Sequence, residues 1–313
     1  MLHYLGIACA MLLGAIGTGI GQGIAGIGCL AAIDRQVLGR EQSFRALLIG
    51  LALSESGAIF SLVIALVLFT GNPATLSLGM GLAELGMGLV IGITAAAAGI
   101  ASGYTVRFAC MAIVRQPFFS QKILTVMLLI QSIIEAPVIF ALIIALLIKT
   151  IGHNMLPYHE GWKLLGAGLA TAFGSIGSLI GSAILAKSAC TSLGLNPNAY
   201  KRIMPFTLLC LTVIQTPVIF ALLISFLLLY ITGLSKTLFV AIICNMAAAC
   251  TMGIGSIGTG IANGFVAAKG CRQIALNTTI YPIILRVTLL SQAVIEASVI
   301  YSFIIGLLLI IRG

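Results

Sequence analysis

Residues 128–140 read LLIQSIIEAPVIF, and residues 208–220 read LLCLTVIQTPVIF. The two stretches are nearly the same, but Gln215 stands in the second where Glu135 stands in the first. An ionised carboxylate inside an apolar run is costly unless it has a partner or a function. The two stretches therefore raise the question of what the acid does in the first copy and why the second copy lacks it.

The composition is that of an integral membrane protein. Of the 313 residues, 60% are hydrophobic and only 7% are charged, and the mean hydropathy is +1.21. Soluble domains carry roughly 25% charged residues. The apolar stretches exceed the ~20 residues that a helix needs to cross a bilayer. The first of them, from Leu5, is too long for the core of a signal peptide, so we expect a structural helix.

The chain repeats one two-helix unit four times. Two columns of residues recur at spacings of 80, 80 and 81: Glu55, Glu135, Gln215 and Glu296, and Gln22, Ser102, Ser182 and Asn263. In lipid only helices and closed barrels satisfy their backbone groups, and these runs are too long for barrel strands. We therefore predict an all-α membrane protein with eight transmembrane helices in four tandem hairpins. The predicted units are 1–78, 79–158, 159–236 (which lacks the carboxylate) and 237–313.

The basic residues predict the topology. The net charge is +9, and 12 of the 16 basic residues lie in or beside the loops inside the hairpins. They are Arg35, Arg40, Arg45, Arg107, Arg115, Lys122, Lys187, Lys201, Arg202, Lys269, Arg272 and Arg286. The positive-inside rule then places these loops in the cytoplasm and both termini on the opposite side. Because the charge is spread over short loops, it does not indicate nucleic-acid binding.

Three of the seven acidic residues lie near the middle of predicted transmembrane helices. Glu55 follows Arg45 by ten residues, which is ~15 Å along a helix and about half of a ~30 Å hydrocarbon core. A charge at this depth costs roughly 2.5–3.5 kcal/mol, and burial favours a protonated carboxyl group. A single protonated glutamate could be a helix–helix contact, but three at one depth, Glu55, Glu135 and Glu296, favour ion-carrying sites. Pro137 and Pro217, two residues after the acid column, are expected to bend their helices.

Several polar residues lie close to the acids in the repeat, either as ion ligands or as interhelical hydrogen-bond partners. These candidates are Gln22, Ser56, Gln131, Asn263, Gln292, Ser298 and Tyr301. The eight cysteines form no CxxC pair and have no histidine cluster beside them, which favours packing residues over a metal or disulfide role. The sequence holds no nucleotide-binding loop or catalytic triad, so we expect a non-catalytic subunit without a cofactor.

These features together resemble a known family. A Gly-rich helix, a polar loop with Arg-Gln and a Leu/Ile-rich helix with one mid-membrane carboxylate are similar to the c subunit, or proteolipid, of rotary ATP synthases and ATPases. The loop reads Arg35-Gln36-Val37 and Arg115-Gln116-Pro117, and it decays to Leu195-Asn196-Pro197 and Leu276-Asn277-Thr278. The resemblance covers nearly the whole chain four times. Residues 54–69, SESGAIFSLVIALVLF, look F-type, whereas fused hairpins with a missing acid resemble some V-type proteolipids.

The resemblance implies a homo-oligomeric c-ring in the lipid bilayer, with the first helix of each hairpin inside. Its implied partners are a stator a subunit and central stalk subunits. Glu55, Glu135 and Glu296 would carry the ion, and Gln215 would be a silent site, one that cannot ionise. Four loop residues match the contact with the stalk: Arg35, Gln36, Arg115 and Gln116.

The ion stays open between protons and sodium. Sodium-type members resemble a pattern with Gln on the first helix, Ser directly after the Glu, and a later Tyr. Unit one has Gln22 and Ser56 but Phe60 at the Tyr position, and unit four has Tyr301 but Ala297 after the acid. We therefore favour protons, with sodium as the alternative and the only metal ion implied.

Two other classes of protein fit less well. A secondary transporter commonly uses inverted repeats around one midplane site, whereas these two-helix units are all parallel. A non-transporting scaffold would not need three buried acids. In a rotor, the silent unit lowers the number of ions carried per turn, which favours ATP-driven pumping over synthesis.

Overall fold

The computed structural model describes residues 1–71, 77–152, 156–231 and 238–312. Within these ranges the chain has eight segments that are long and apolar enough to cross a membrane. The main helices are α1 (Leu2–Arg35), α2 (Arg40–Ser54), α3 (Ser56–Phe69), α4 (Leu78–Arg115), α5 (Ser120–Ile151), α6 (Tyr158–Leu195), α7 (Tyr200–Tyr230), α8 (Leu238–Leu276) and α9 (Tyr281–Arg312). The α2–α3 pair is one span interrupted at Glu55, so the nine helices make four hairpins.

The two helices of each hairpin are joined by one non-helical residue and a short 3-10 turn. These turns are η1 (Val37–Gly39), η3 (Pro117–Phe119), η4 (Pro197–Ala199) and η5 (Thr278–Ile280). The joining residue is Gln in the first two hairpins and Asn in the last two. The Asn196 and Asn277 side chains accept hydrogen bonds from backbone N–H groups two residues later, at 3.2 and 3.0 Å. The turn is thus kept where the Arg-Gln loop sequence is lost.

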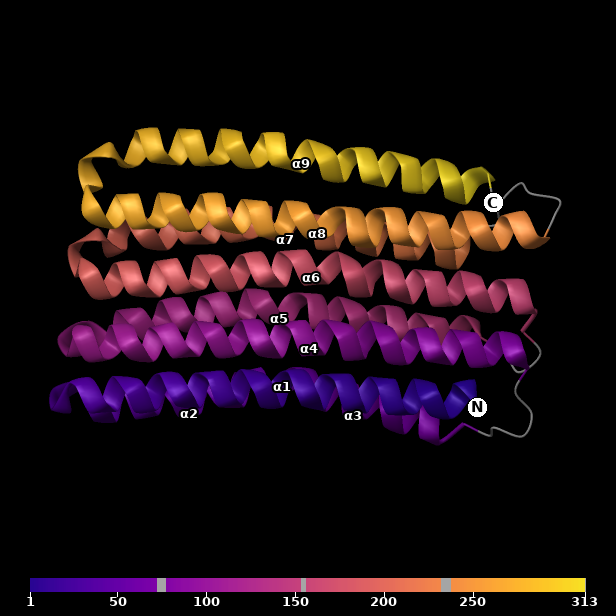
Figure 1. The fold of residues 1–313 in the computed structure, drawn as a ribbon, viewed down its shortest axis with the longest axis horizontal. Coiled ribbons are helices and arrows are strands. Elements are labelled where there is room, and N and C mark those ends of the chain that lie inside the picture. Colours follow the sequence, from indigo (N-terminus) through magenta and orange to yellow (C-terminus); the bar gives the residue numbers. More distant parts are fainter. Residues whose placement is uncertain (72–76, 153–155, 232–237, 313) are drawn as a thin grey trace.

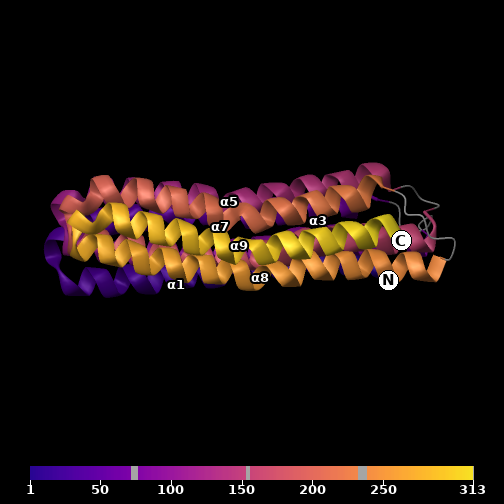
Figure 2. The same cartoon turned by 90° about the horizontal axis from the view of Figure 1, so that it is seen from above.

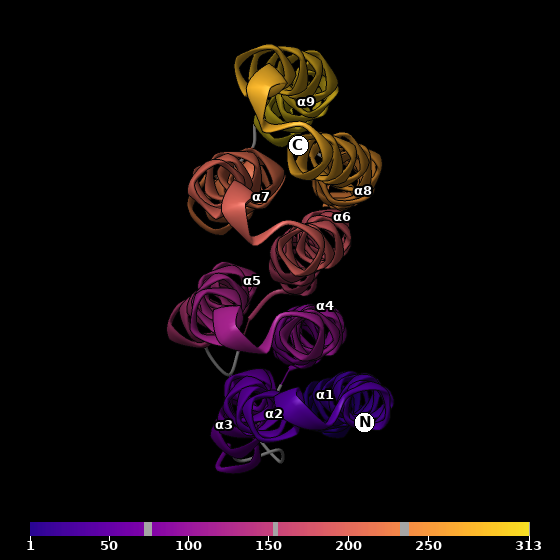
Figure 3. The same cartoon turned by 90° about the vertical axis from the view of Figure 1, so that its left-hand side faces the viewer.

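The four hairpins stand side by side in chain order, with their helices along one long axis (Figures 1 and 2). The turns lie at one end, and the start of α1 and the end of α9 lie at the other (Figure 1). Seen end-on, the first helices α1, α4, α6 and α8 form one row, and the second helices form another (Figure 3). The row of first helices lies on the concave side, so the molecule is an arc of two layers.

Glycine allows the row of first helices to pack with backbones close together. A β-carbon at Gly103 of α4 would overlap the Gly21 backbone of α1, and one at Gly264 of α8 would overlap Gly181 of α6. The second helices are rich in Leu, Ile and Val, and they need more room. Small residues inside and large residues outside give each hairpin a wedge shape, which explains the curvature of the arc.

Pro137 and Pro217 lie inside helices α5 and α7, which continue on both sides of them. The bend expected at these prolines stays a prediction. The second helix of the first hairpin, which contains no proline, is interrupted at Glu55. The helices α4 and α6 begin at Leu78 and Tyr158, one residue before the predicted unit boundaries, and the boundary at 236/237 lies at residues outside those that the structure describes.

Candidate functional site

The acid column lies halfway along the second helices. Glu135 is 15 residues after Ser120 and 16 before Ile151, which are the ends of α5. Glu296 has the same place in α9, between Tyr281 and Arg312. These helices of 32 residues are ~48 Å long, so the carboxylates are more than about 20 Å from either end. The position of these carboxylates at mid-length of their helices is the one that the sequence analysis expected.

Within each hairpin, the first helix makes one polar contact with the second helix near the acid column. The donors and acceptors are Gln22 Nε2 to Glu55 Oε1 (3.2 Å), Gln131 Nε2 to Ser102 Oγ (2.6 Å), Gln215 Nε2 to Ser182 Oγ (3.2 Å) and Gln292 Nε2 to the Asn263 carbonyl oxygen (3.4 Å). In the first hairpin the amide belongs to Gln22 on the first helix. In the second and fourth hairpins it belongs to Gln131 and Gln292, which lie one turn before the acid on the second helix. An amide is therefore retained beside each carboxylate, although its position in the hairpin changes.

A second set of contacts crosses between hairpins. Ser56 of the first hairpin donates a hydrogen bond from its Oγ to Glu135 Oε2 of the second hairpin, at 2.5 Å. The Gln131 side chain also donates to the Gly50 carbonyl oxygen of α2, at 3.0 Å. The Glu135 site is thus shared by two neighbouring hairpins. The sequence analysis placed Ser56 near Glu55 and did not assign its hydroxyl to Glu135.

The residue after the acid column alternates between hydroxyl and methyl side chains. The four are Ser56, Ala136, Thr216 and Ala297. Thr216 lies beside the Glu296 carboxyl group of the next hairpin, and it also donates a long hydrogen bond, 3.4 Å, to the Thr212 carbonyl oxygen. Thr216 was not among the predicted site residues. Hairpins one and three therefore present a hydroxyl to the carboxylates of hairpins two and four.

Buried oxygens without a hydrogen-bond partner gather around two of the carboxylates. Among the described residues, these include Glu135 Oε1 and Gln131 Oε1 in the second hairpin, and Glu296 Oε1, Gln292 Oε1 and Asn263 Oδ1 in the fourth. Most buried polar groups in proteins have a partner. A proton on the carboxyl group, or a cation between these oxygens, would supply the interaction that each one lacks.

Ser298 and Tyr301 have no hydrogen bond to a carboxylate among the described residues. Ser298 donates to the Ile295 carbonyl oxygen of its own helix, at 2.8 Å, and Tyr301 is 66% exposed. Glu55 is itself exposed, because it lies at the free edge of the arc beside a groove of about 350 Å³. The loop residues Arg35 and Arg115 end their helices at the turn end of the molecule, and both are exposed.

A second charged cluster lies at the opposite end from the turns. His3 Nδ1 is 2.7 Å from Glu84 Oε2, and Lys149 Nζ is 3.4 Å from Glu84 Oε1. Glu84 is completely buried, and the three residues come from α1, α4 and α5. The repeat equivalents of Glu84 are uncharged, and within the part of the chain that the structure describes such a cluster joins the first and second hairpins alone.

Each hairpin matches the sequence model of one known family. This family, described as the C subunit of ATP synthase, matches four times, at residues 5–68, 85–148, 165–228 and 246–309. The chain belongs to this family. Each match covers the two apolar segments of one hairpin, so this integral, multi-pass membrane protein is a fourfold proteolipid of the rotor type.

Individual relatives match about one hairpin each. ATP synthase c subunit 2 of Pelobacter propionicus is 41% identical over 69 residues, 22% of this chain and 76% of that protein. The ATP synthase c subunit of Dehalococcoides mccartyi is 46% identical over 68 residues, 22% of this chain and 90% of its own length. The ATP synthase c subunit of Alkaliphilus oremlandii is 44% identical over 69 residues, 22% and 77% of the two chains. A whole relative thus corresponds to one of the four hairpins.

Proposed function

We propose that copies of this chain close head-to-tail into a membrane rotor ring, and that the ring carries protons on Glu55, Glu135 and Glu296. The carboxylates lie at mid-length, and one of them is completed by the neighbouring hairpin through Ser56. This shared site is the observation that carries the proposal. An ion bound between two hairpins can be released and replaced each time the rotating ring brings that pair of hairpins to the same fixed point.

The two free edges of the arc support ring closure. A β-carbon at Gly19 or Gly23 of α1 would meet none of the described atoms within 4 Å. Their repeat equivalents in α4, Gly99 and Gly103, pack directly on the α1 backbone. Gly19 and Gly23 therefore present the surface that, elsewhere in the chain, receives the preceding hairpin.

The other edge is complementary to the first. Gly258 of α8 also has open space around it, whereas its equivalent Gly177 of α6 packs on Ile257 of α8. The free face of α8 thus matches the face that binds the following hairpin. An edge that fits the opposite edge of a second copy makes a heterologous interface, and a curved heterologous assembly closes into a ring.

Inside this ring, each carboxylate would be protonated while it faces lipid, because a charge at mid-membrane is unfavourable. Release requires a polar or positively charged surface, which we assign to a stator a subunit. The turns, with Arg35, Gln36, Arg115 and Gln116, would face the cytoplasm and contact central stalk subunits, and both termini would lie on the opposite side. ATP chemistry would belong to those partners, and this chain would be non-catalytic.

Carbodiimide labelling tests the carrier role, since the reagent attacks a protonated carboxyl group. We expect labelling at Glu55, Glu135 and Glu296 in the membrane-embedded assembly. Each Glu→Gln substitution should remove label from its own peptide and reduce ion-coupled ATP hydrolysis. Full coupled activity in the triple Glu→Gln variant would contradict the proposal and favour a scaffold.

Sodium is the second candidate ion. The hydroxyl group that a neighbouring hairpin places beside a carboxylate, as Ser56 does at Glu135, favours it. Hydroxyl, amide and carboxylate oxygens are ligands for hard cations. Such oxygens from Ser56, Gln131 and Glu135 gather at the second hairpin, two of them without a hydrogen-bond partner. If sodium is carried, sodium chloride at fixed pH should protect Glu135 from carbodiimide, and potassium chloride should not. Equal labelling in the two salts would leave protons as the ion.

A further inference from the structure

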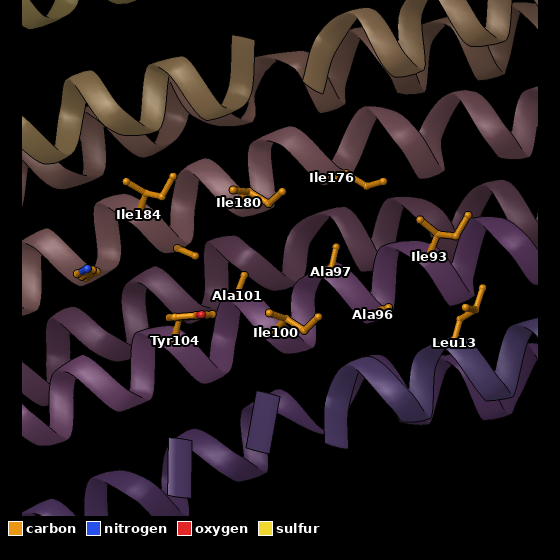
Figure 4. A pocket seen from close by; sticks show the side chains of 12 residues that line it. Leu13, Ile93, Ala96, Ala97, Ile100, Ala101, Tyr104, Ile176, Ile180 and Ile184 are labelled. Atoms are coloured by element: carbon orange, nitrogen blue, oxygen red, sulfur yellow. The ribbon is translucent and has the colours of Figure 1, made fainter. Parts of the chain in front are cut away.

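The concave face carries two neighbouring cavities, one at the level of the acid column and one on the turn side of it. The first, about 670 Å³, is lined by α1, α4 and α6 and is almost entirely apolar, with Ile, Ala and Leu side chains (Figure 4). The second, about 450 Å³, lies between α6 and α8. Ile184 and Lys187 line both cavities, so the two are direct neighbours. None of the residues lining either cavity comes from a second helix.

The second cavity is basic. Lys187, Lys269 and Arg272 line it together with the hydroxyl groups of Ser188 and Thr191. All three basic residues are exposed, and the ion pairs among the described residues involve only His3, Arg45 and Lys149 as cations. The cavity therefore holds three positive charges that no acidic side chain of this face balances.

The depth of these charges makes a partner necessary. Ser182 and Asn263 mark the level of the acid column, and Lys187 follows Ser182 by five residues. At 1.5 Å per residue, Lys187 is ~8 Å from the midplane, inside the ~15 Å half-thickness of the hydrocarbon core. A lysine at this depth is unfavourable unless it extends toward the interface or meets an anion.

Neighbouring aromatic and guanidinium groups support an anion site. Lys187 Nζ lies 5.1 Å from the centre of the Phe108 ring, and the Arg107 guanidinium lies 5.7 Å from the same ring. The Arg107 Nε is buried and has no hydrogen-bond partner among the described residues. Arg107, which packs beside Gly28 of α1, thus shares the Phe108 ring with Lys187 and holds a cationic donor without a protein acceptor.

We propose that this pair of cavities binds an anionic phospholipid from the leaflet on the turn side. The phosphate would contact Lys187, Lys269 and Arg272, and an acyl chain would enter the apolar cavity between α4 and α6. The basic cavity lies on the turn side and the apolar cavity next to it, toward the midplane. A lipid of this leaflet has its phosphate and its acyl chains in the same order. The inference concerns one chain and does not depend on which ion the carboxylates carry.

Lipid retention by the detergent-extracted assembly of the full chain tests this site. After exchange into dioleoyl phosphatidylglycerol or dioleoyl phosphatidylcholine, bound lipid is counted by native mass spectrometry. We expect phosphatidylglycerol to be retained about a hundredfold better, since each of the three basic residues contributes on the order of 1 kcal/mol near anionic lipid and ~1.4 kcal/mol is a factor of ten. The Lys187→Gln/Lys269→Gln/Arg272→Gln variant should lose this preference.

A matched control removes the same charge elsewhere at the turn end. Lys122, Lys201 and Arg202 are also exposed, and two of them lie beside aromatic rings on the second helices. Their triple Gln variant should keep the preference for phosphatidylglycerol. Unchanged carbodiimide labelling of Glu135 in both variants shows that the fold is intact.

A second variant tests the acyl chain. Ala97→Leu/Ala183→Leu fills the apolar cavity and should lower retention while leaving the basic cluster in place. Three results would overturn the proposal. The basic triple variant could retain as much phosphatidylglycerol as the unmodified chain. Inorganic phosphate at equal concentration could displace the lipid, or the mass spectrum could show a bound acidic peptide in place of the lipid.

Discussion

At the scale of single residues, the sites of this protein differ although the repeat places them alike. Glu135 receives a hydroxyl hydrogen bond from Ser56, Glu296 lies beside Thr216, and Glu55 has an amide partner in Gln22. In a closed ring, Glu55 would face Ala297 of the next copy, which has no hydroxyl group. The three carriers should therefore bind and release their ion with different affinities.

Replacing Ser56 tests this difference. A hydrogen bond to a carboxylate stabilises its charged form by about 1.5–3 kcal/mol, and each 1.4 kcal/mol is a factor of about ten. In Ser56→Ala the protonated form of Glu135 becomes more populated at a given alkaline pH, so its carbodiimide labelling should rise about tenfold. Labelling of Glu296 is the internal control, and Ser56→Thr should behave as the unmodified chain. Equal labelling of Glu135 in Ser56→Ala would mean that the bond does not affect the carboxyl group.

Restoring the missing acid is the complementary experiment. Gln215 already contacts Ser182 of its own hairpin, as Gln22 contacts Glu55, so Gln215→Glu has room and a polar neighbour. The number of carriers per chain rises from three to four, and the ions moved per ATP should rise by about a third, each worth ~2.3 kcal/mol per 100 mV. The measurement uses vesicles with the assembled ATP synthase, and Gln215→Leu is the control. A ratio that already matches four carriers in the unmodified chain would refute the silent site.

At the scale of helices, the sequence predicted each span because lipid leaves little choice of structure. The spacing of 80, 80 and 81 residues placed Glu55, Glu135 and Glu296 at one level. It did not show which hairpin supplies a hydroxyl to which acid, because a repeat fixes height along a helix and not the face that meets a neighbour. The sequence also could not show that α5 continues as a helix through Pro137. A helix can pass a proline when neighbouring groups compensate for the lost hydrogen bond, and the repeat alone does not show them.

The cluster of His3, Glu84 and Lys149 joins helices of the first and second hairpins through a fully buried carboxylate. Removing one partner of a buried ion pair leaves a charge without compensation and typically costs about 3–5 kcal/mol. Glu84→Gln should therefore lower the thermal stability of the extracted protein markedly, and Glu84→Gln/Lys149→Gln should recover part of the loss. Glu41→Gln, which breaks an exposed pair with Arg45, should cost less than about 1 kcal/mol. Equal effects of Glu84→Gln and Glu41→Gln would show that the cluster is not a junction.

At the scale of the whole molecule, the arc and its two glycine edges make the prediction about assembly. Gly23→Leu lies on the open face of α1, so the single chain should fold normally. The equivalent position in α4, Gly103, packs on the Gly21 backbone of the preceding first helix. In a ring, Gly23 would pack in the same way on α8 of the neighbouring copy, so Gly23→Leu should block that contact. Ile20→Phe is the control, because its equivalents Ile100 and Ile180 line the cavity on the concave face.

The mass of the extracted assembly, measured by native mass spectrometry, distinguishes the outcomes. The unmodified chain and Ile20→Phe should give one closed oligomer, and Gly23→Leu should give monomers or short open arcs. Gly258→Leu should have the same effect from the other edge, because both residues belong to one interface. A closed oligomer of unchanged mass in both glycine variants would mean that the chain does not meet its neighbour through α1 and α8. In that case no hairpin of a second copy would pack beside Glu55, whereas Glu135 and Glu296 each have a preceding hairpin beside them.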